Sequence, residues 1–275
     1  MKNATQASPG HQQTLSPTVF WRIAEDIPKS LQITLSILSV CLPFLVWFVI
    51  SLMVNSKFLP SPWQVVLALG NLWESGYLLK DTFMSCLRVG LGFLLAAMVA
   101  IPIGLAMGSF ASIRALLEPM VGIFRYMPAP AFIPLLIIYL GLDETPKITL
   151  IFIGTVFFNV LMIMDAVKFV PKDLIEATYT LGGKRSQVLF QVITPHVIPS
   201  ILDTLRVNMA TSWSLVMVAE LVAANEGLGK RIQLAQRFFK TDEIFACLIV
   251  LGLIGFLLDV GLQAMLRLTC RWAVD

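Results

Sequence analysis

Long apolar runs separated by short polar segments dominate this chain. A helix needs about 20 mostly apolar residues to cross a hydrocarbon core of roughly 30 Å. Six runs meet or approach that length, at residues 30–56, 89–113, 126–142, 148–164, 207–224 and 244–266. The pattern therefore predicts an all-α membrane protein with about six transmembrane helices.

The later runs contain or adjoin ionisable residues and prolines, which are unfavourable in direct contact with lipid. Glu220 and Asp259 interrupt the last two runs, and Arg125 directly precedes the third. An ionisable side chain at membrane depth is costly unless it faces protein or a water-filled cavity. Three prolines in the run 126–142 free backbone carbonyls, which favours a helix that lines a pathway. A simple kink in a buried helix is the alternative interpretation.

Composition agrees with a location in lipid. Hydrophobic residues make up 57% of the chain and charged residues only 13%, against about a quarter charged in globular proteins. The net charge of +3 and the scattered basic residues form no patch for nucleic acid. Because the four cysteines contain no Cys-x-x-Cys pair, we interpret them as packing residues and predict neither a disulfide framework nor a metal site.

The first 30 residues differ from the rest of the chain. They are polar and lack the early apolar core of a secretory signal. We expect residues 1–30 to form a partly disordered cytoplasmic tail, in which residues 17–30 have the composition of a short interfacial helix. Residues 31–275 then form a single transmembrane domain.

The longest polar interruption in the second half of the chain covers residues 165–206. Pro171 suits the first turn of a helix, and Glu176 lies near that helix's positive end. Gly182-Gly183 would stop this helix before a second one begins. The sequence thus predicts a compact helix–glycine–helix knob that fits a cleft on another protein.

Two prolines follow the knob. Pro195 and Pro199 are expected to bound a turn before the chain re-enters the membrane.

The loop also carries a motif at fixed spacing. Its residues are Glu176-Ala177-Thr178, Gly182 and Val192-Ile193-Thr194-Pro195. They resemble the cytoplasmic loop signature of binding-protein-dependent ABC importer permeases, whose usual form is Glu-Ala-Ala, three residues, Gly, nine residues and Ile-x-Leu-Pro. Thr178, Val192 and Thr194 depart from that form, but the spacing is intact.

Segments outside the loop extend the resemblance over roughly residues 58–265. They include Leu59-Pro60-Ser61-Pro62, Phe124-Arg125-Tyr126-Met127-Pro128, Ala219-Glu220 and Gly227-Leu228-Gly229. They look like the nitrate/sulfonate/taurine branch of the same family. The resemblance implies a type I ABC importer (MetI-like) permease fold, with residues 31–275 as the permease domain and 165–206 as its cytoplasmic coupling loop.

The resemblance implies an assembly as well. It consists of two permease copies, expected to be a homodimer, two cytoplasmic ABC ATPase subunits and a periplasmic or lipid-anchored substrate-binding protein. The chain would lie in membrane lipid as a multi-pass protein of the bacterial inner membrane, with both termini cytoplasmic. The distribution of Lys and Arg favours that orientation only weakly.

No nucleotide site is expected on this chain. A P-loop requires Gly-x-x-x-x-Gly-Lys-Ser/Thr, and neither Gly182-Gly183-Lys184 nor Gly229-Lys230 has that context. We therefore expect a transport subunit that is not an enzyme and binds no cofactor. ATP and Mg²⁺ would act on the partner ATPase.

The resemblance assigns ATPase docking to Glu176, Ala177, Gly182, Gly183 and Pro195. Glu176 would anchor the knob, and Gly182 would permit a sharp bend and a close approach of backbones. The alternative for Glu176 is an ordinary carboxylate near a helix N-terminus, which stabilises a helix by about 0.5 kcal/mol.

For the substrate pathway we predict Arg125, Asn159, Trp213, Ser214 and Glu220, which lie at or within the apolar runs. Arg125 would attract an anion, or else snorkel to the membrane surface. Glu220 would repel an anion, so we expect it to pair with a basic residue. Trp213 is a pathway residue or an interfacial packing aromatic.

The substrate that the resemblance implies is a small anion such as nitrate, a sulfonate or taurine. Bicarbonate, cyanate and a thiamine precursor are alternatives. A different class of protein, an ion-coupled secondary transporter, would use Glu220 or Asp259 for protons. Such a transporter has no need of a docking loop at this spacing.

Overall fold

The computed structural model describes residues 27–54, 57–270 and 272. It divides into two units, at residues 1–53 and 54–275, and each is described by itself. Our prediction for residues 1–26 lies outside the described residues. In the first unit, α1 (Lys29–Met53) is an apolar helix that contains Pro43, and of its side chains only Ser51 is buried.

The second unit is built from helices alone within its described residues. In chain order they are α2 (Pro62–Glu74), α3 (Tyr77–Ser109), α4 (Ala111–Tyr126), the 3-10 helix η2 (Ala129–Phe132), α5 (Ile133–Leu140), α6 (Thr145–Lys168), α7 (Lys172–Thr180), α8 (Arg185–Gln187), the π-helix η3 (Val188–Ile193), α9 (Thr194–Ala223), α10 (Leu228–Arg237) and α11 (Thr241–Thr269).

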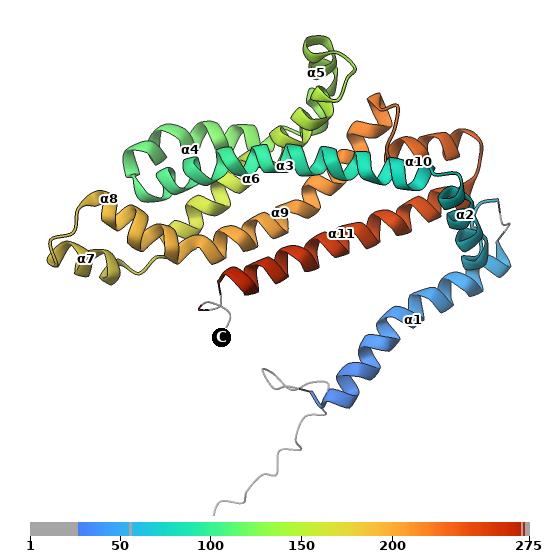
Figure 1. Ribbon diagram of the computed structural model, residues 1–275, viewed down its shortest axis with the longest axis horizontal. Helices are drawn as coiled ribbons and strands as arrows, with labels where there is room; N and C mark the ends of the chain where they lie inside the picture. Colours follow the sequence, from blue (N-terminus) through green and yellow to red (C-terminus); the bar gives the residue numbers. More distant parts are fainter. Residues whose placement is uncertain (1–26, 55–56, 271, 273–275) are drawn as a thin grey trace, which may run out of the picture. The chain divides into compact units, whose positions relative to one another are not determined.

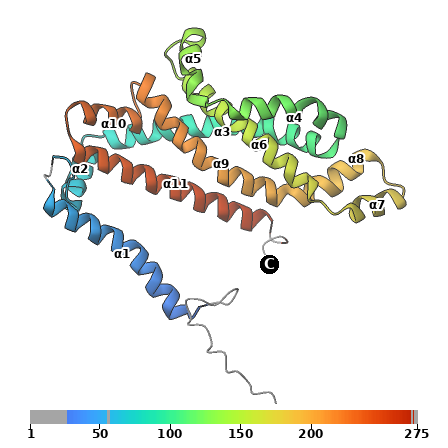
Figure 2. The same cartoon turned by 180° about the vertical axis from the view of Figure 1, so that it is seen from behind.

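Four long helices, α3, α6, α9 and α11, run alongside one another in both views (Figures 1 and 2). Helices α7 and α8 lie at one end of this bundle, which we call the α7 end. Helix α10 lies at the opposite end, which we call the α10 end. The long helices therefore connect the knob at 172–187 with a second structured region at their other end.

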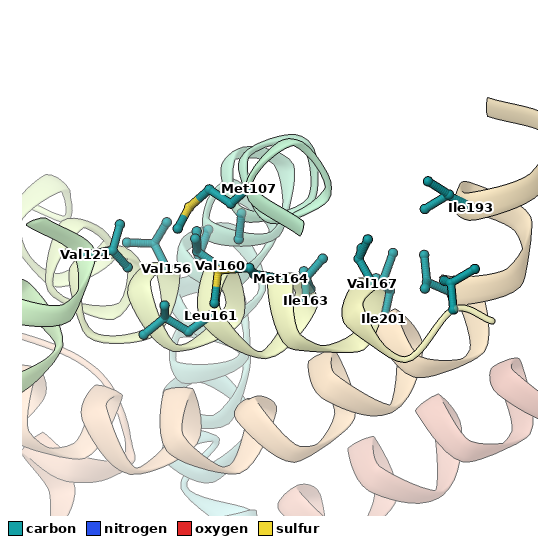
Figure 3. Close-up of a cluster of buried hydrophobic side chains, with 14 of the residues drawn as sticks. Met107, Val121, Val156, Val160, Leu161, Ile163, Met164, Val167, Ile193 and Ile201 are labelled. Atoms are coloured by element: carbon teal, nitrogen blue, oxygen red, sulfur yellow. The ribbon is translucent and has the colours of Figure 1, made fainter. Parts of the chain in front are cut away.

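The core of the second unit lies chiefly between α3 and α6. Figure 3 shows Met107 of α3 beside Val160 and Met164 of α6, within a cluster of buried apolar side chains. Glycines let the two helices approach closely: a Cβ added at Gly104 would lie 2.8 Å from the Ile163 Cβ. Lipid supplies no hydrophobic driving force for association between helices. Small residues at the interface let the backbones come close, so that van der Waals packing holds the helices together.

Among the residues that the structure describes, five helices are long and apolar enough to cross a membrane, or six if one bent pair is counted as a single span. Several are longer than the apolar runs that predicted them. Helix α3 begins at Tyr77 instead of residue 89. The apolar run is shorter than the helix because Lys80, Asp81 and Arg88 lie in the first part of α3, where oppositely charged partners neutralise them.

The third predicted run, 126–142, is not one straight helix. Helix α4 ends at Tyr126, and the chain then turns by 86° into η2 and α5. Met127 is extended, with φ −78° and ψ 121°, because a residue that precedes proline is forced out of the helical region. The break at Pro128 is thus a bent pair, consistent with the broken helix that the prolines indicated.

Helix is also continuous where we expected a turn. The segment from Arg185 to Val222 runs as one helical span, so Pro195 and Pro199 lie inside helix. The π-helix η3 precedes Pro195, and the Thr194 hydroxyl donates to the Leu189 carbonyl at 2.7 Å. Widening the helix here accommodates the proline ring, which otherwise clashes with the carbonyl four residues earlier.

Candidate functional site

The predicted helix–glycine–helix knob is present at the α7 end. Helix α7 follows Pro171 and ends at Thr180, and Gly182 adopts a left-handed φ of +80°. The backbone N–H of Gly182 donates to the Tyr179 carbonyl, and that of Gly183 donates to the Thr178 carbonyl, each at 2.9 Å. This closes α7 with the left-handed glycine that commonly terminates helices.

Four of the expected docking residues lie in this knob, and Pro195 lies beyond it in α9. Glu176, Ala177 and Gly182 are exposed, whereas Gly183 and Pro195 are half-buried. Glycine is required at these two positions for different reasons. Gly182 needs its positive φ, while a Cβ at Gly183 would lie 2.7 Å from the Thr178 methyl group.

A concave region of about 230 Å³ lies between the knob and the bundle. Ile175 and Tyr179 of α7 line it together with Ser109 and Phe110, where α3 passes into α4. The knob therefore borders the end of α3 across this hollow.

A buried network of charged side chains occupies the α10 end, and Arg88 of α3 is its centre. Arg88 is only 1% exposed. Its Nη1 donates to Glu220 Oε1 at 2.6 Å and to the Glu226 carbonyl at 2.7 Å. Its Nε and Nη2 both donate to the carboxylate of Glu144, which precedes α6. The guanidinium thus joins α3 to α6 and α9.

Glu220 is fully buried in α9, and each of its oxygens accepts a hydrogen bond. Its Oε1 also accepts from the Ser85 hydroxyl at 2.8 Å, and its Oε2 accepts from the Gly229 N–H at 2.8 Å. A Cβ at Gly227 would collide with the Glu220 carboxyl group. The glycines of the Gly227-Leu-Gly229 segment therefore let the backbone approach this carboxylate.

Asp81 holds the start of α10 in the same way. Its Oδ1 accepts from the Gly227 N–H at 2.9 Å, and its Oδ2 accepts from Arg231 Nε at 2.8 Å. The Arg231 guanidinium lies 4.1 Å from the centre of the Tyr77 ring. Buried charges persist only when they are paired and hydrogen-bonded, and here each carboxylate has such partners.

Glu144 is the most exposed carboxylate of the network and lies outside the spanning helices. Its side chain is 44% exposed, and its Oε1 also accepts from Lys147 Nζ at 2.9 Å. The pKa of Glu144 is lowered from 4.5 to about 2. Hydrogen bonding from Arg88 is the largest cause, burial opposes it, and Lys147 adds to the lowering.

Sequence reasoning identified Glu220 and expected a basic partner, but it did not identify Arg88, Asp81 or Ser85 as parts of one site. A signal was present, since residues 81, 85 and 88 are spaced to lie on one helix face. The partner helices could not be deduced, because Arg88 and Glu220 are 132 positions apart.

The other predicted pathway residues do not gather around Glu220. Trp213 is buried and its indole N–H donates to the Leu251 carbonyl of α11 at 3.0 Å, which is a packing arrangement. Ser214 is exposed and donates to the Ala210 carbonyl of its own helix at 3.1 Å. The hydrogen-bond donors of Trp213 and Ser214 therefore both have acceptors within the protein.

Arg125 and Asn159 are less completely satisfied. Arg125 lies in the last turn of α4 and donates to the Tyr126 hydroxyl at 3.1 Å, while its buried Nε meets no acceptor among the described residues. Asn159 of α6 accepts from Asn208 Nδ2 at 2.6 Å, and its own Nδ2 has no acceptor within the described part of the chain. Asp259 forms a bidentate pair with Arg206 at 2.6 and 2.9 Å.

Comparison with known proteins places this architecture in a family. Residues 99–271 match the family described as "Binding-protein-dependent transport system inner membrane component". The chain belongs to that family. It is 35% identical over 252 residues to the taurine transport system permease protein TauC of Escherichia coli K12, covering 89% of this chain and 92% of that protein.

A second relative and a solved structure agree. The nitrate import permease protein NrtB of Synechocystis is 31% identical over 210 residues, covering 73% of this chain and 76% of that protein. A structure of the MetNI methionine ABC transporter in inward-facing conformations contains a chain that matches with a TM-score of 0.63 at 18% identity. The match covers 70% of this chain and 95% of that one. The fold is therefore the MetI-like permease fold of type I ABC importers, as predicted.

Proposed function

We propose that this chain is the permease subunit of an ATP-binding-cassette importer for a small anion, of the sulfonate, taurine or nitrate type. The observation that carries the proposal is the exposed knob of α7 and α8, joined at Gly182, which has the spacing of the family's loop. The taurine and nitrate permeases named above support the substrate class.

In this proposal the α7 end faces the cytoplasm and docks an ABC ATPase. Glu176, Ala177, Gly182, Gly183 and Pro195 form or support the docking surface. ATP and Mg²⁺ act on the ATPase, and this chain binds no cofactor. Two copies of the chain form the permease in the bacterial inner membrane, with both termini cytoplasmic, and a substrate-binding protein delivers the anion at the α10 end.

The continuous helix from α8 through α9 supplies a mechanical link for such a cycle. It runs from Arg185, in the knob, to Val222, two residues after the buried Glu220. A displacement of the knob therefore moves the helix that carries one carboxylate of the Arg88 network. Transport needs two states with different contacts, and breaking or forming this network distinguishes two such states.

We retain Asn159 and Arg125 as residues of the substrate pathway. Each has a buried N–H group that finds no acceptor among the described residues. Such a group favours an anion or water that would accept its hydrogen bond. Trp213, Ser214 and Glu220 have structural partners, so their contribution would come through the positions of α9 and α10.

The test replaces Gly182 with Asp in the full chain, expressed with its cognate ATPase and binding protein. The ATPase should co-purify with the permease at a level reduced roughly tenfold or more, which corresponds to about 1.4 kcal/mol of lost association free energy. Uptake of radiolabelled taurine should fall in parallel, while the amount of permease in the membrane stays unchanged.

Gly76→Asp is the matched control. Gly76 is exposed, has a φ of +73° and has no neighbour within 4 Å of an added Cβ, so it reproduces the backbone strain and the added charge away from the knob. It should retain the ATPase. Normal ATPase recovery and normal uptake in Gly182→Asp would refute the docking role. Taurine uptake that persists after ATP depletion would refute the importer class.

A further inference from the structure

Glu144 sits between two buried cations at the α10 end. The side chains of Arg88 and Lys147 are 1% and 3% exposed, whereas that of Glu144 is 44% exposed. One Glu144 oxygen accepts from both Arg88 Nη2 and Lys147 Nζ, each at 2.9 Å, and the other accepts from Arg88 Nε. The partly exposed carboxylate of Glu144 thus neutralises two buried cations, Arg88 and Lys147.

Arg88 does not depend on Glu144 for its place. Its Nη1 is held by Glu220 at 2.6 Å and by the Glu226 carbonyl at 2.7 Å. The edge formed by Nε and Nη2, which faces Glu144, would therefore keep its orientation if Glu144 moved away. That edge matches any oxyanion with two coplanar oxygens.

Lys147 lies in apolar surroundings, and its Nζ donates to Glu144. Its side chain lines a narrow apolar cleft together with Ile133, Ile137 and Leu150. An ammonium group in such a place needs a counterion, because desolvation of an unpaired charge is costly. Without Glu144, Arg88 and Lys147 together exceed the single charge of Glu220 by one positive charge, which favours binding of an anion.

We propose that Arg88 and Lys147 form an oxyanion-binding site at the α10 end, and that Glu144 is a displaceable occupant of that site. The ligand is the sulfonate group, or another small oxyanion, of the transported substrate. This inference rests on the proposed function as an anion permease. Lys147 and Arg88 are its binding residues, and Glu220 is a positioning residue that orients Arg88.

Displacement has a structural consequence. Glu144 directly precedes α6, and its bond with Arg88 ties the start of α6 to α3. An anion that takes over Arg88 and Lys147 would release this tie. Arrival of the substrate would then loosen the contact between α3 and the α5–α6 segment.

The experiment measures binding of two probes, inorganic sulfate and methanesulfonate, to the purified permease–ATPase complex by isothermal titration calorimetry. Glu144→Gln removes the competing charge but keeps the size of the side chain. It should bind both probes roughly tenfold more tightly than the wild type, because the anion no longer competes with a carboxylate for the charge-assisted hydrogen bonds of Arg88 and Lys147. Adding Lys147→Gln to that variant should abolish the gain.

Glu243→Gln is the matched control. Glu243 is a carboxylate near the start of α11 that accepts from Lys240 at 2.6 Å. This variant should bind the probes as the wild type does. If Glu144→Gln does not yield folded complex, Glu144→Asp takes its place, because the shorter side chain weakens the contact with Arg88 and should raise affinity in the same direction.

Unchanged affinity in Glu144→Gln, or a gain that survives Lys147→Gln, would overturn the site. An equal gain in Glu243→Gln would show a general effect of net charge and would also overturn it. Taurine uptake by the wild type is recorded separately. If uptake fails while the binding pattern holds, the proposed substrate is wrong and the oxyanion site stands.

Discussion

Arg88 carries its charge inside the bundle because acceptors surround its guanidinium on every polar edge. Glu220, Glu144 and the Glu226 carbonyl take its donors. Counting Lys147, Arg231, Asp81 and the two glutamates, the side chains of this network balance as three positive and three negative charges. This balance explains how six ionisable groups lie at the end of an apolar bundle.

At the residue scale, part of this site is accessible from the sequence. An acidic residue in an apolar run must be paired, which predicts a basic partner for Glu220. The identity of that partner depends on how α3 packs against α9. The sequence contains no information on that packing beyond the spacing of Asp81, Ser85 and Arg88 on one helix face.

The lowered pKa of Glu144 predicts a specific dependence of stability on pH. Because its pKa falls from 4.5 to about 2 on folding, its contribution is fully present above pH 4.5 and is lost as the pH falls toward 2. The apparent melting temperature of the purified permease should therefore drop between pH 5 and pH 3. The drop should be smaller in Glu144→Gln, which has no titratable group at this position.

The informative quantity is the difference between the wild type and this variant, since other carboxylates titrate in both. Glu243→Gln again serves as the control and should leave the curve of the wild type nearly unchanged. If the wild type and Glu144→Gln lose stability in parallel over this range, the Arg88–Glu144 contact does not stabilise the fold.

At the element scale, the contact between α3 and α6 organises the second unit. Gly92, Gly104 and Gly108 of α3 bring its backbone against α6, where added Cβ atoms would strike Ile151, Ile163 and Val167. The sequence shows the Gly104-x-x-x-Gly108 spacing, which indicates a close helix contact. It does not show which helix makes that contact, because such patterns are frequent in membrane proteins.

This contact predicts the effect of a larger side chain. Gly104→Val should force α3 away from α6 and destabilise the permease by about 1–3 kcal/mol, as is usual when a packed core is overfilled. Thermal stability in detergent and the yield of folded protein measure the loss. Gly90→Val is the matched control on the same helix, because no atom lies within 4 Å of a Cβ at Gly90.

Gly90→Val should leave stability nearly unchanged or raise it slightly, because valine has a somewhat higher helix propensity than glycine. Equal losses in both variants would mean that the close approach of α3 to α6 does not determine the result.

At the scale of the whole molecule, the apolar runs predicted the helical class and the number of spans. The ends of the spans were less predictable. Helices α3 and α9 extend beyond their apolar runs, because the charges and prolines in those extensions are accommodated by tertiary contacts and by the π-helix at 188–193. Such accommodation depends on neighbours that a pattern of single residues does not reveal.

The arrangement of the second unit, with the knob at one end and the Arg88 network at the other, leads to a prediction about the membrane. If the α7 end is cytoplasmic, a cysteine at Ser186 of α8 and one at Gln236 of α10, both exposed, must lie on opposite sides. In a background whose four native cysteines are replaced by serine, a membrane-impermeant maleimide applied to intact spheroplasts should label Gln236→Cys and spare Ser186→Cys.

Permeabilised membranes should allow both cysteines to react, which controls for access of the reagent. Labelling of Ser186→Cys alone in intact spheroplasts would invert the orientation and place the knob where no ATPase could reach it, because ATP is confined to the cytoplasm.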